Sequence, residues 1–456
     1  MIEFIRLVLP YLFVLYFIVK GIKEPLYLLG IPILMFMSNS IFFEGVKLLR
    51  IPGRLNFGLM FIWLVIFRIA SIIIPTINEK IELSFTPRRL NALDYCIMGL
   101  VLISFVGLGM TIINYSVLTD VFKEFFVLIS LFICYFIMKN WSLNYKPEVL
   151  ENFLFSLLII NSIACVFYIL HQGLHIRIYQ SLEYQTEIFN GEEITRTFWF
   201  MPQFLFFSIA YCLVNRDKRP FVYSVLLIIN LLATFITYFR SFIIIAVILF
   251  LFFFILTGIK NGRLGMVVRK ILIFSMIAIL GFFILSKVLP SNTKYFIERF
   301  SELTESRRSW EQNDLEYRFT MTGQIISTID DNKKILGMGS VTENQVPWVL
   351  NMRETTADMV WTGVIFRWGF VGLILFILLY IFSIIKAYNI YMNSEGALSD
   401  LSLLFLLYII SQILQSFIDW TFMSGHGFAV GLWYFALLSA LIGFYENKVL
   451  SEEKTI

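Results

Sequence analysis

The chain has 456 residues, of which 59% are hydrophobic and only 15% are charged, and its formal net charge at pH 7 is +4. Soluble proteins carry about 25% charged residues, so this composition excludes a water-soluble globular protein. The small net charge says little about partners, and we expect no nucleic-acid ligand.

Apolar runs long enough to cross a bilayer as helices recur from one end of the chain to the other, and each crossing needs about 20 residues. The predicted fold is therefore all-α, a polytopic bundle of about 12 transmembrane helices. The expected spans are 4–20, 25–43, 56–76, 93–115, 120–138, 150–170, 197–214, 221–238, 241–258, 270–289, 360–385, 401–420 and 428–445.

Short loops rich in lysine and arginine stay in the cytoplasm. Segments 215–220 and 259–270 are the clearest such loops, which places the long polar segments 171–196 and 290–358 outside. One conflict remains: the basic segments 43–54 and 86–94 both look cytoplasmic although one span separates them, so a count of about 13 spans stays open.

These assignments divide the chain into three parts. Residues 1–289 form the N-terminal part of the transmembrane bundle, 290–358 form a large, partly helical extracytoplasmic loop, and 359–456 contain the C-terminal helices and a cytoplasmic tail.

Arg240 is a single full charge within the apolar stretch 234–246. A guanidinium in hydrocarbon costs roughly 2.5–3.5 kcal/mol. Forty residues between the basic flanks Arg219 and Lys260 make about 60 Å of helix, which is two crossings with almost no loop. Arg240 lies at the midpoint, so we expect it at the outer tip of a tight helical hairpin, where it either anchors the hairpin or faces a polar pocket.

No cofactor or metal site is expected. The four cysteines all lie inside apolar runs and read as small hydrophobic residues. His171 and His175 have helical spacing but no third ligand, and the sequence has no Asp-x-Asp pattern typical of divalent-metal sites.

Three sequence features occur in the order that is typical of one family. The first is the hairpin tip Thr237-Tyr238-Phe239-Arg240, and the second is Arg318 followed by a helical stretch and the turn Gly337-Met338-Gly339. The third is segment 358–372, which begins with Asp358 and ends Gly-Phe-Val-Gly.

With these features the chain resembles the O-antigen polymerase and O-antigen ligase superfamily. Asp358 stands where the ligase pattern has histidine, and Phe239 stands where the family's hairpin has serine, which favours the polymerase branch. The resemblance implies a GT-C-like membrane glycosyltransferase of the bacterial cytoplasmic membrane, with its active site on the extracytoplasmic side. It implies an undecaprenyl-pyrophosphate-linked oligosaccharide as substrate, contact with membrane lipid, and a chain-length regulator protein as a further partner.

The chemistry that such a reaction needs suggests roles for several residues. Pyrophosphate is a good leaving group that needs charge compensation, which arginine supplies through paired contacts to phosphate oxygens. Arg240 and Arg318 are therefore the expected pyrophosphate clamp. The expected catalytic base is Asp358, with Glu354 and His426 as alternatives. Arg307, Arg308, Arg353 and Tyr317 are candidates for glycan or lipid contacts.

The function expected from the resemblance is polymerisation of lipid-linked repeat units of O-antigen, capsule or exopolysaccharide at the outer membrane face. A ligase-like transferase that moves finished glycan onto a lipid or other acceptor is the alternative. A lipid-linked sugar flippase is a further alternative, although it predicts charges at mid-membrane depth and repeated halves, and neither is evident.

Overall fold

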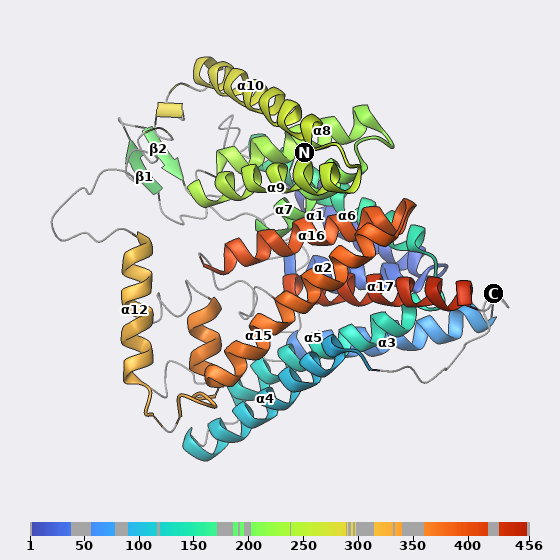
Figure 1. The fold of residues 1–456 in the computed structure, drawn as a ribbon, viewed down its shortest axis with the longest axis vertical. Helices are drawn as coiled ribbons and strands as arrows, with labels where there is room; N and C mark the ends of the chain where they lie inside the picture. The colour runs from blue at the N-terminus through green and yellow to red at the C-terminus, as the bar shows by residue number, and fades with distance from the viewer. Residues whose placement is uncertain are drawn as a thin grey trace. The chain divides into compact units, whose positions relative to one another are not determined.

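The computed structural model describes residues 2–37, 56–77, 90–115, 119–170, 186–189, 192–195, 202–237, 239–288, 290, 293–294, 297, 314–331, 333–339, 360–417 and 428–453. Helices dominate these residues (Figure 1). In chain order they are α1 (Ile2–Gly21), the 3-10 helix η1 (Pro25–Leu29), α2 (Gly30–Met37), α3 (Asn56–Ile77), α4 (Ala92–Tyr115), α5 (Thr119–Ser142), α6 (Pro147–Tyr168), α7 (Pro202–Asn215), α8 (Pro220–Ile236), α9 (Arg240–Lys260), α10 (Leu264–Val288), α12 (Asp314–Thr328), α15 (Val360–Asn393), α16 (Gly396–Ser416) and α17 (Phe428–Glu453).

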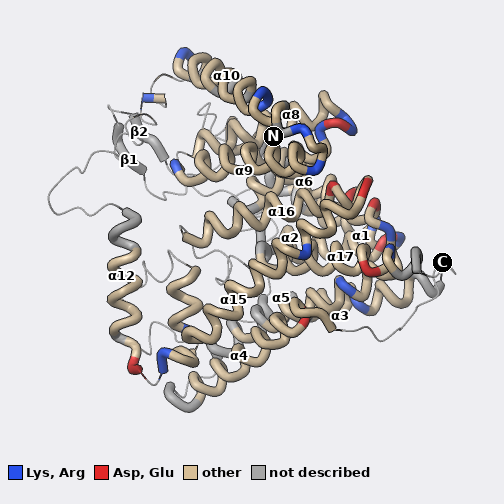
Figure 2. The backbone as a smooth tube through the Cα atoms, in the orientation of Figure 1, with Lys and Arg blue, Asp and Glu red and all other residues tan. Residues whose placement is uncertain are grey.

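Five of the described helices are long and apolar enough to cross a membrane. This agrees with the predicted helical membrane protein, while the total of about 12 spans stays a prediction. Figure 2 shows that charged residues gather mostly near helix ends and that the helical middles are largely uncharged. The five helices are Ala92–Ile112, Pro147–Tyr168, Arg240–Lys260, Val360–Asn393 and Gly396–Ser416.

The structure adds one β-hairpin that the helical prediction did not include. Strands β1 (Thr186–Phe189) and β2 (Glu192–Thr195) pair antiparallel, with Phe189 opposite Glu192. The two residues between them in the sequence are Asn190 and Gly191, which is the dipeptide most typical of a two-residue hairpin loop.

The chain forms two compact units. The first unit comprises residues 1–3 and 158–317, and the second comprises 4–157 and 318–456, so the division falls inside α6 and α12. The three-part organisation expected from the sequence is a separate division, and it stays a prediction.

In the second unit, α17 lies along α5, and α15 packs on both α4 and α16. The contact between α4 and α15 is close because glycines face the partner helix: a Cβ added at Gly99 would lie 3.1 Å from Leu375, and one at Gly107 would lie 3.3 Å from Trp368. Small residues at such positions let membrane helices approach each other.

Helix α15 reverses direction at Gly369, which has φ 62° and ψ −162°. In a straight helix Trp361 and Phe376 would be about 22 Å apart along the axis, yet their ring centroids are 5.8 Å apart. The first arm, 360–368, therefore folds back beside the second arm, 370–393 (Figure 1). The expected single span over 360–385 is wrong in its first part, because the apolar run continues through a reversal of the backbone.

Segment 25–43 also differs from a simple span in its described part. It begins with η1, in which Pro25 occupies the first turn, and continues as the eight-residue helix α2. Residues 38–43 lie outside the described part of the chain.

Candidate functional site

The first element of the site is the hairpin formed by α8 and α9 in the first unit. Helix α8 has 17 residues and α9 has 21, which correspond to about 26 Å and about 32 Å. Only 237–239 separate them, and Arg240 is the first residue of α9, with a partly exposed side chain. The hairpin with Arg240 at its tip, predicted from charge spacing, is confirmed.

The hairpin turn is shaped by threonine side chains. The Thr237 hydroxyl donates to the Thr234 carbonyl at 2.7 Å, and the Phe239 N–H donates to Thr237 Oγ1 at 3.4 Å. The Thr234 hydroxyl in turn donates to the Asn230 carbonyl at 2.7 Å. These contacts satisfy backbone groups where the helical pattern stops, which a turn within an apolar environment requires.

A buried cluster of neutral polar residues joins α8 to α6 and α7 in the same unit. Asn161 Nδ2 donates to Ser208 Oγ at 2.9 Å and to Asn230 Oδ1 at 3.1 Å, and Asn230 Nδ2 donates to Ser162 Oγ at 3.0 Å. All four side chains are buried. Because interhelical amide and hydroxyl bonds hold membrane helices together, this cluster fixes the helix that leads to the hairpin tip.

The second element of the site is an interlock between residues 334–339 and the reversal of α15, both in the second unit. The N–H groups of Met338 and Gly339 donate to the carbonyls of Phe366 and Arg367, at 2.7 and 3.0 Å. In the opposite direction, the N–H groups of Phe370 and Val371 donate to the carbonyls of Lys334 and Ile335, at 2.9 and 3.2 Å. The loop thus caps the end of the first arm and the beginning of the second, where helices leave backbone groups without internal partners.

Glycine is required at this interlock for two reasons. Gly337 and Gly369 have φ values of +79° and +62°, which side-chain-bearing residues adopt only at a cost. A Cβ added at Gly337 would also lie 2.5 Å from the Arg367 carbonyl carbon, and one at Gly369 would collide with the backbone of Ile335. Gly339, with φ +83°, lies against the Gly107 carbonyl of α4.

Helix α12 leads into the interlock and packs on the first arm of α15. Ile325 and Ile329 form a buried cluster with Met338, Ile365 and Phe366. Next to this cluster, the hydroxyls of Thr322 and Thr362 share a 2.7 Å hydrogen bond. The helix, the Gly-x-Gly turn and the apolar segment, which follow one another in the sequence, therefore pack together as one assembly.

The loop after α12 carries two lysine–aspartate pairs. Lys333 Nζ lies 3.5 Å from Asp330, and Lys334 Nζ donates to Asp331. This hydrogen bond holds the pKa of the exposed Asp331 carboxyl below its usual value. Both pairs have i,i+3 spacing within the turn, so they favour its local shape.

The structure describes the backbone of Tyr317 and Arg318, which both lie in the first turns of α12. Arg318 belongs to the second unit and Arg240 to the first, so their convergence on one phosphate stays a prediction. The remaining predicted site residues lie outside the described part of the chain: Arg307, Arg308, Arg353, Glu354, Asp358 and His426.

Within the described ranges, no group of three or more histidine, cysteine, aspartate or glutamate residues could hold a metal ion. His171 and His175 lie outside those ranges. The four cysteines are free and buried, as small apolar residues would be.

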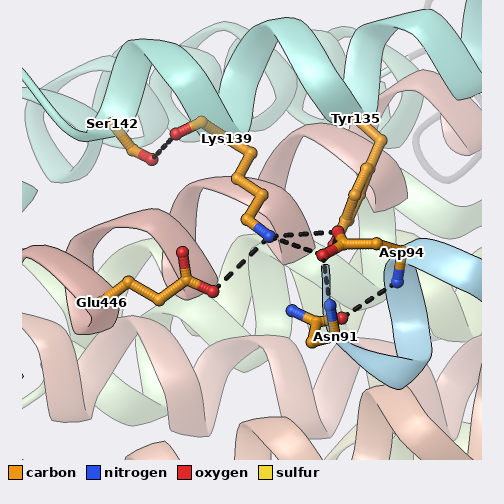
Figure 3. Close-up of polar contacts among 6 residues, drawn as sticks. All are labelled: Asn91, Asp94, Tyr135, Lys139, Ser142 and Glu446. Atoms are coloured by element: carbon orange, nitrogen blue, oxygen red, sulfur yellow. Dashed lines mark hydrogen bonds and ion pairs between the residues drawn. The ribbon is translucent and has the colours of Figure 1, made fainter. Parts of the chain in front are cut away.

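A buried ionic cluster centred on Asp94 was not predicted from the sequence (Figure 3). Asp94 has no exposed surface, and its carboxylate accepts from Tyr135 at 2.8 Å and from Lys139 Nζ at 2.9 and 3.0 Å. It also accepts from the Asn91 N–H at 2.8 Å, and Glu446 lies 3.5 Å from Lys139. The cluster joins the beginning of α4 to the ends of α5 and α17. The sequence did contain a signal for this cluster, because Asp94, Lys139 and Glu446 stand at or next to the ends of three expected spans.

Comparison with known proteins supports the resemblance. Residues 225–377 match the family model described as O-antigen ligase. No curated protein matches the chain. The matched region begins in α8 and ends in α15, and so contains the hairpin tip, α12, the Gly-x-Gly turn and the reversal at Gly369. These residues support placing the chain in the O-antigen polymerase and O-antigen ligase superfamily.

Proposed function

We propose that this protein joins lipid-linked glycan repeat units at the outer face of the bacterial cytoplasmic membrane. A membrane protein with a ligase- or polymerase-like role in polysaccharide assembly is what the family match supports. The finer proposal is that the donor is an undecaprenyl-pyrophosphate-linked oligosaccharide and that the acceptor is a second lipid-linked unit.

The observation that carries the proposal is the position of Arg240. A cation stands as the first residue of an otherwise apolar 21-residue helix, at a turn of three residues, inside the matched region. A guanidinium at such a place is costly unless it serves a ligand or a polar neighbour. A diphosphate head group at the membrane boundary is a ligand of matching charge and geometry.

In the proposed reaction, a hydroxyl oxygen of the acceptor sugar attacks the anomeric carbon of the donor. The bond between that carbon and the pyrophosphate oxygen breaks, and undecaprenyl pyrophosphate leaves with the electron pair. Arg240 and Arg318 stabilise the negative charge that develops on the leaving group. Asp358 accepts the proton of the acceptor hydroxyl, with Glu354 and His426 as alternative bases. No metal ion is assigned a role in this proposal.

The direct experiment incubates the purified protein with lipid-linked oligosaccharide and no other enzyme, and separates the products on a gel. We expect a ladder of lengths from the wild type and single units from Arg240→Ala. Arg240→Lys keeps the charge but loses the paired geometry, so we expect partial activity at most. Arg263→Ala is the matched control, because Arg263 is exposed in the turn between α9 and α10, at the end of α9 that is opposite Arg240. A full ladder from Arg240→Ala would refute the proposed clamp.

A ligase is the second candidate, because the matched family model is described as O-antigen ligase. A ligase would leave the length of the donor glycan unchanged and move it to a different acceptor. Offering the purified protein donor alone, and then donor with a lipid acceptor that carries no pyrophosphate, separates the two activities by product.

A further inference from the structure

Helix α3 carries one charge, Arg68, near the middle of an otherwise apolar sequence of 22 residues. One side of the helix is exposed and apolar, with Ile62, Val65, Ile66, Ile69 and Ile73. The opposite side is buried, with Leu64, Phe67 and Ser71. From the helical spacing, Arg68 lies at the border between the two sides, and its side chain is partly buried. A long side chain at this border reaches both the packed helices and the surrounding lipid.

The guanidinium of Arg68 has one hydrogen-bond partner in the part of the chain that the structure describes. Its Nη1 donates to Asn140 Oδ1 of α5 at 2.7 Å, and this neutral acceptor satisfies one of five N–H donors. Within the same ranges no carboxylate pairs with Arg68. Lys139, by contrast, lies between two carboxylates, Asp94 at 2.9 Å and Glu446 at 3.5 Å. Because an unpaired cation in an apolar helix is costly, the remaining donors of Arg68 call for an anion.

The contact with Asn140 places the guanidinium at a boundary of the membrane. Asn140 lies in the last turn of α5. At this level three helices carry charged residues at or near the ends of their apolar parts, namely Asp94 of α4, Lys139 of α5 and Glu446 of α17 (Figure 3). In the orientation predicted from the loop charges, this is the cytoplasmic boundary. Arg68 therefore lies at the depth of lipid head groups, although it stands near the middle of its own helix.

The free donors and the lipid-facing position specify the ligand. The planar guanidinium matches phosphate oxygens in paired contacts, and basic sites between membrane helices on the cytoplasmic side suit anionic head groups. A zwitterionic lipid would bring a second cation, and the described residues provide no carboxylate beside Arg68 to receive it. We propose that Arg68 and Asn140 form a binding site for the phosphate group of an anionic phospholipid. Asn140 orients the guanidinium, and Arg68 binds the phosphate oxygens.

This site is separate from the proposed glycan chemistry. Arg68 lies outside the matched region 225–377, and the site uses neither Arg240 nor Arg318. The bound lipid would neutralise a charge beside the contact between α3 and α5, so we expect it to stabilise the second unit against unfolding.

The test titrates the purified full chain in an uncharged detergent with phosphatidylglycerol and follows thermal unfolding by intrinsic fluorescence. We expect Arg68→Gln to need about tenfold more of this lipid than the wild type for half of the full stabilisation, because hydrogen bonds to a charged group are lost. Arg263→Gln is the matched control, since it removes the same charge from an exposed position on the predicted cytoplasmic side, and it should respond as the wild type does. Phosphatidylcholine and inorganic phosphate are the comparison probes, and neither should stabilise the wild type as phosphatidylglycerol does.

An unchanged response of Arg68→Gln to phosphatidylglycerol would overturn the site, and a lower melting temperature at every lipid concentration would then assign Arg68 to a partner within the chain. An equal loss of response in Arg263→Gln would reduce the effect to general attraction between charges. Equal stabilisation by inorganic phosphate would replace the lipid with a soluble anion. Arg68→Lys decides the question if Arg68→Gln does not fold: it keeps the cation but loses the paired geometry, so we expect a weaker response, and a response equal to that of the wild type would overturn the site.

Discussion

Replacing Gly337 with alanine tests whether the interlock holds the second unit together. The new Cβ would lie 2.5 Å from the carbonyl carbon and oxygen of Arg367 and 2.6 Å from the Gly369 nitrogen. All three are backbone atoms, so relief requires the loop to move away from α15 and to weaken the hydrogen bonds that join them.

The loss of stability expected from Gly337→Ala has two contributions. A side chain at φ +79° costs about 1–2 kcal/mol. Four backbone hydrogen bonds cross the interlock, and the loss of two of them adds about 1–3 kcal/mol at roughly 0.5–1.5 kcal/mol each. We therefore expect Gly337→Ala to lower the free energy of unfolding by about 2–5 kcal/mol.

Gly396 provides the matched control. It lies in the same unit with φ +61°, but an added Cβ would meet nothing within 4 Å. Gly396→Ala should therefore lose only about 1–2 kcal/mol from backbone strain. Thermal unfolding in detergent, followed by intrinsic fluorescence, compares the two variants. If Gly337→Ala unfolds at the same temperature as Gly396→Ala, the steric reasoning is wrong.

Further variants test the other features. Lys139→Met leaves the buried Asp94 carboxylate without a cation and should lower the free energy of unfolding by about 3–5 kcal/mol. The double variant with Asp94→Asn should recover much of this stability, and no recovery would contradict the pairing. Asn230→Leu removes one of the two hydrogen-bond partners of Asn161 Nδ2, the other being Ser208, and should lower the free energy of unfolding by about 1–3 kcal/mol. A wild-type melting temperature would show that the cluster contributes little. Cysteines placed at the exposed positions Gly262 and Lys294 test topology, because the four native cysteines are buried. An impermeant maleimide added to whole cells should label only position 294, and the reverse pattern would contradict the predicted orientation.

The hairpin at Arg240 was predictable because its length is fixed by physical constraints. Basic residues marked both outer limits, and helix rise and bilayer thickness left almost no residues for a loop. The turn at Gly337 and Gly339 was predictable for a similar reason, since paired glycines indicate backbone conformations that other residues avoid.

The reversal at Gly369 was not predictable from the apolar pattern. Hydropathy reports whether a residue avoids water and says nothing about the direction of the chain, and glycine is common within membrane helices. The two arms are identified by the non-helical backbone of Gly369 and by the position of Trp361 beside Phe376, and both depend on the fold.

The cluster around Asp94 depends on how neighbouring helices are rotated about their axes. Asp94 and Lys139 are 45 residues apart in the chain, and their contact forms because α4 and α5 present these positions to each other. The sequence locates such residues near the ends of spans, but it does not indicate their partners.

The interlock between the Gly-x-Gly loop and α15 is made from peptide groups, and this has an evolutionary consequence. Side chains such as those of Ile335 and Met338 contribute no hydrogen bond to it, whereas the glycines determine whether the two segments can approach. Substitutions at the positions between these glycines therefore leave the hydrogen bonds of the interlock in place. Such a chain can change most of its surface residues over evolution while it keeps the same scaffold.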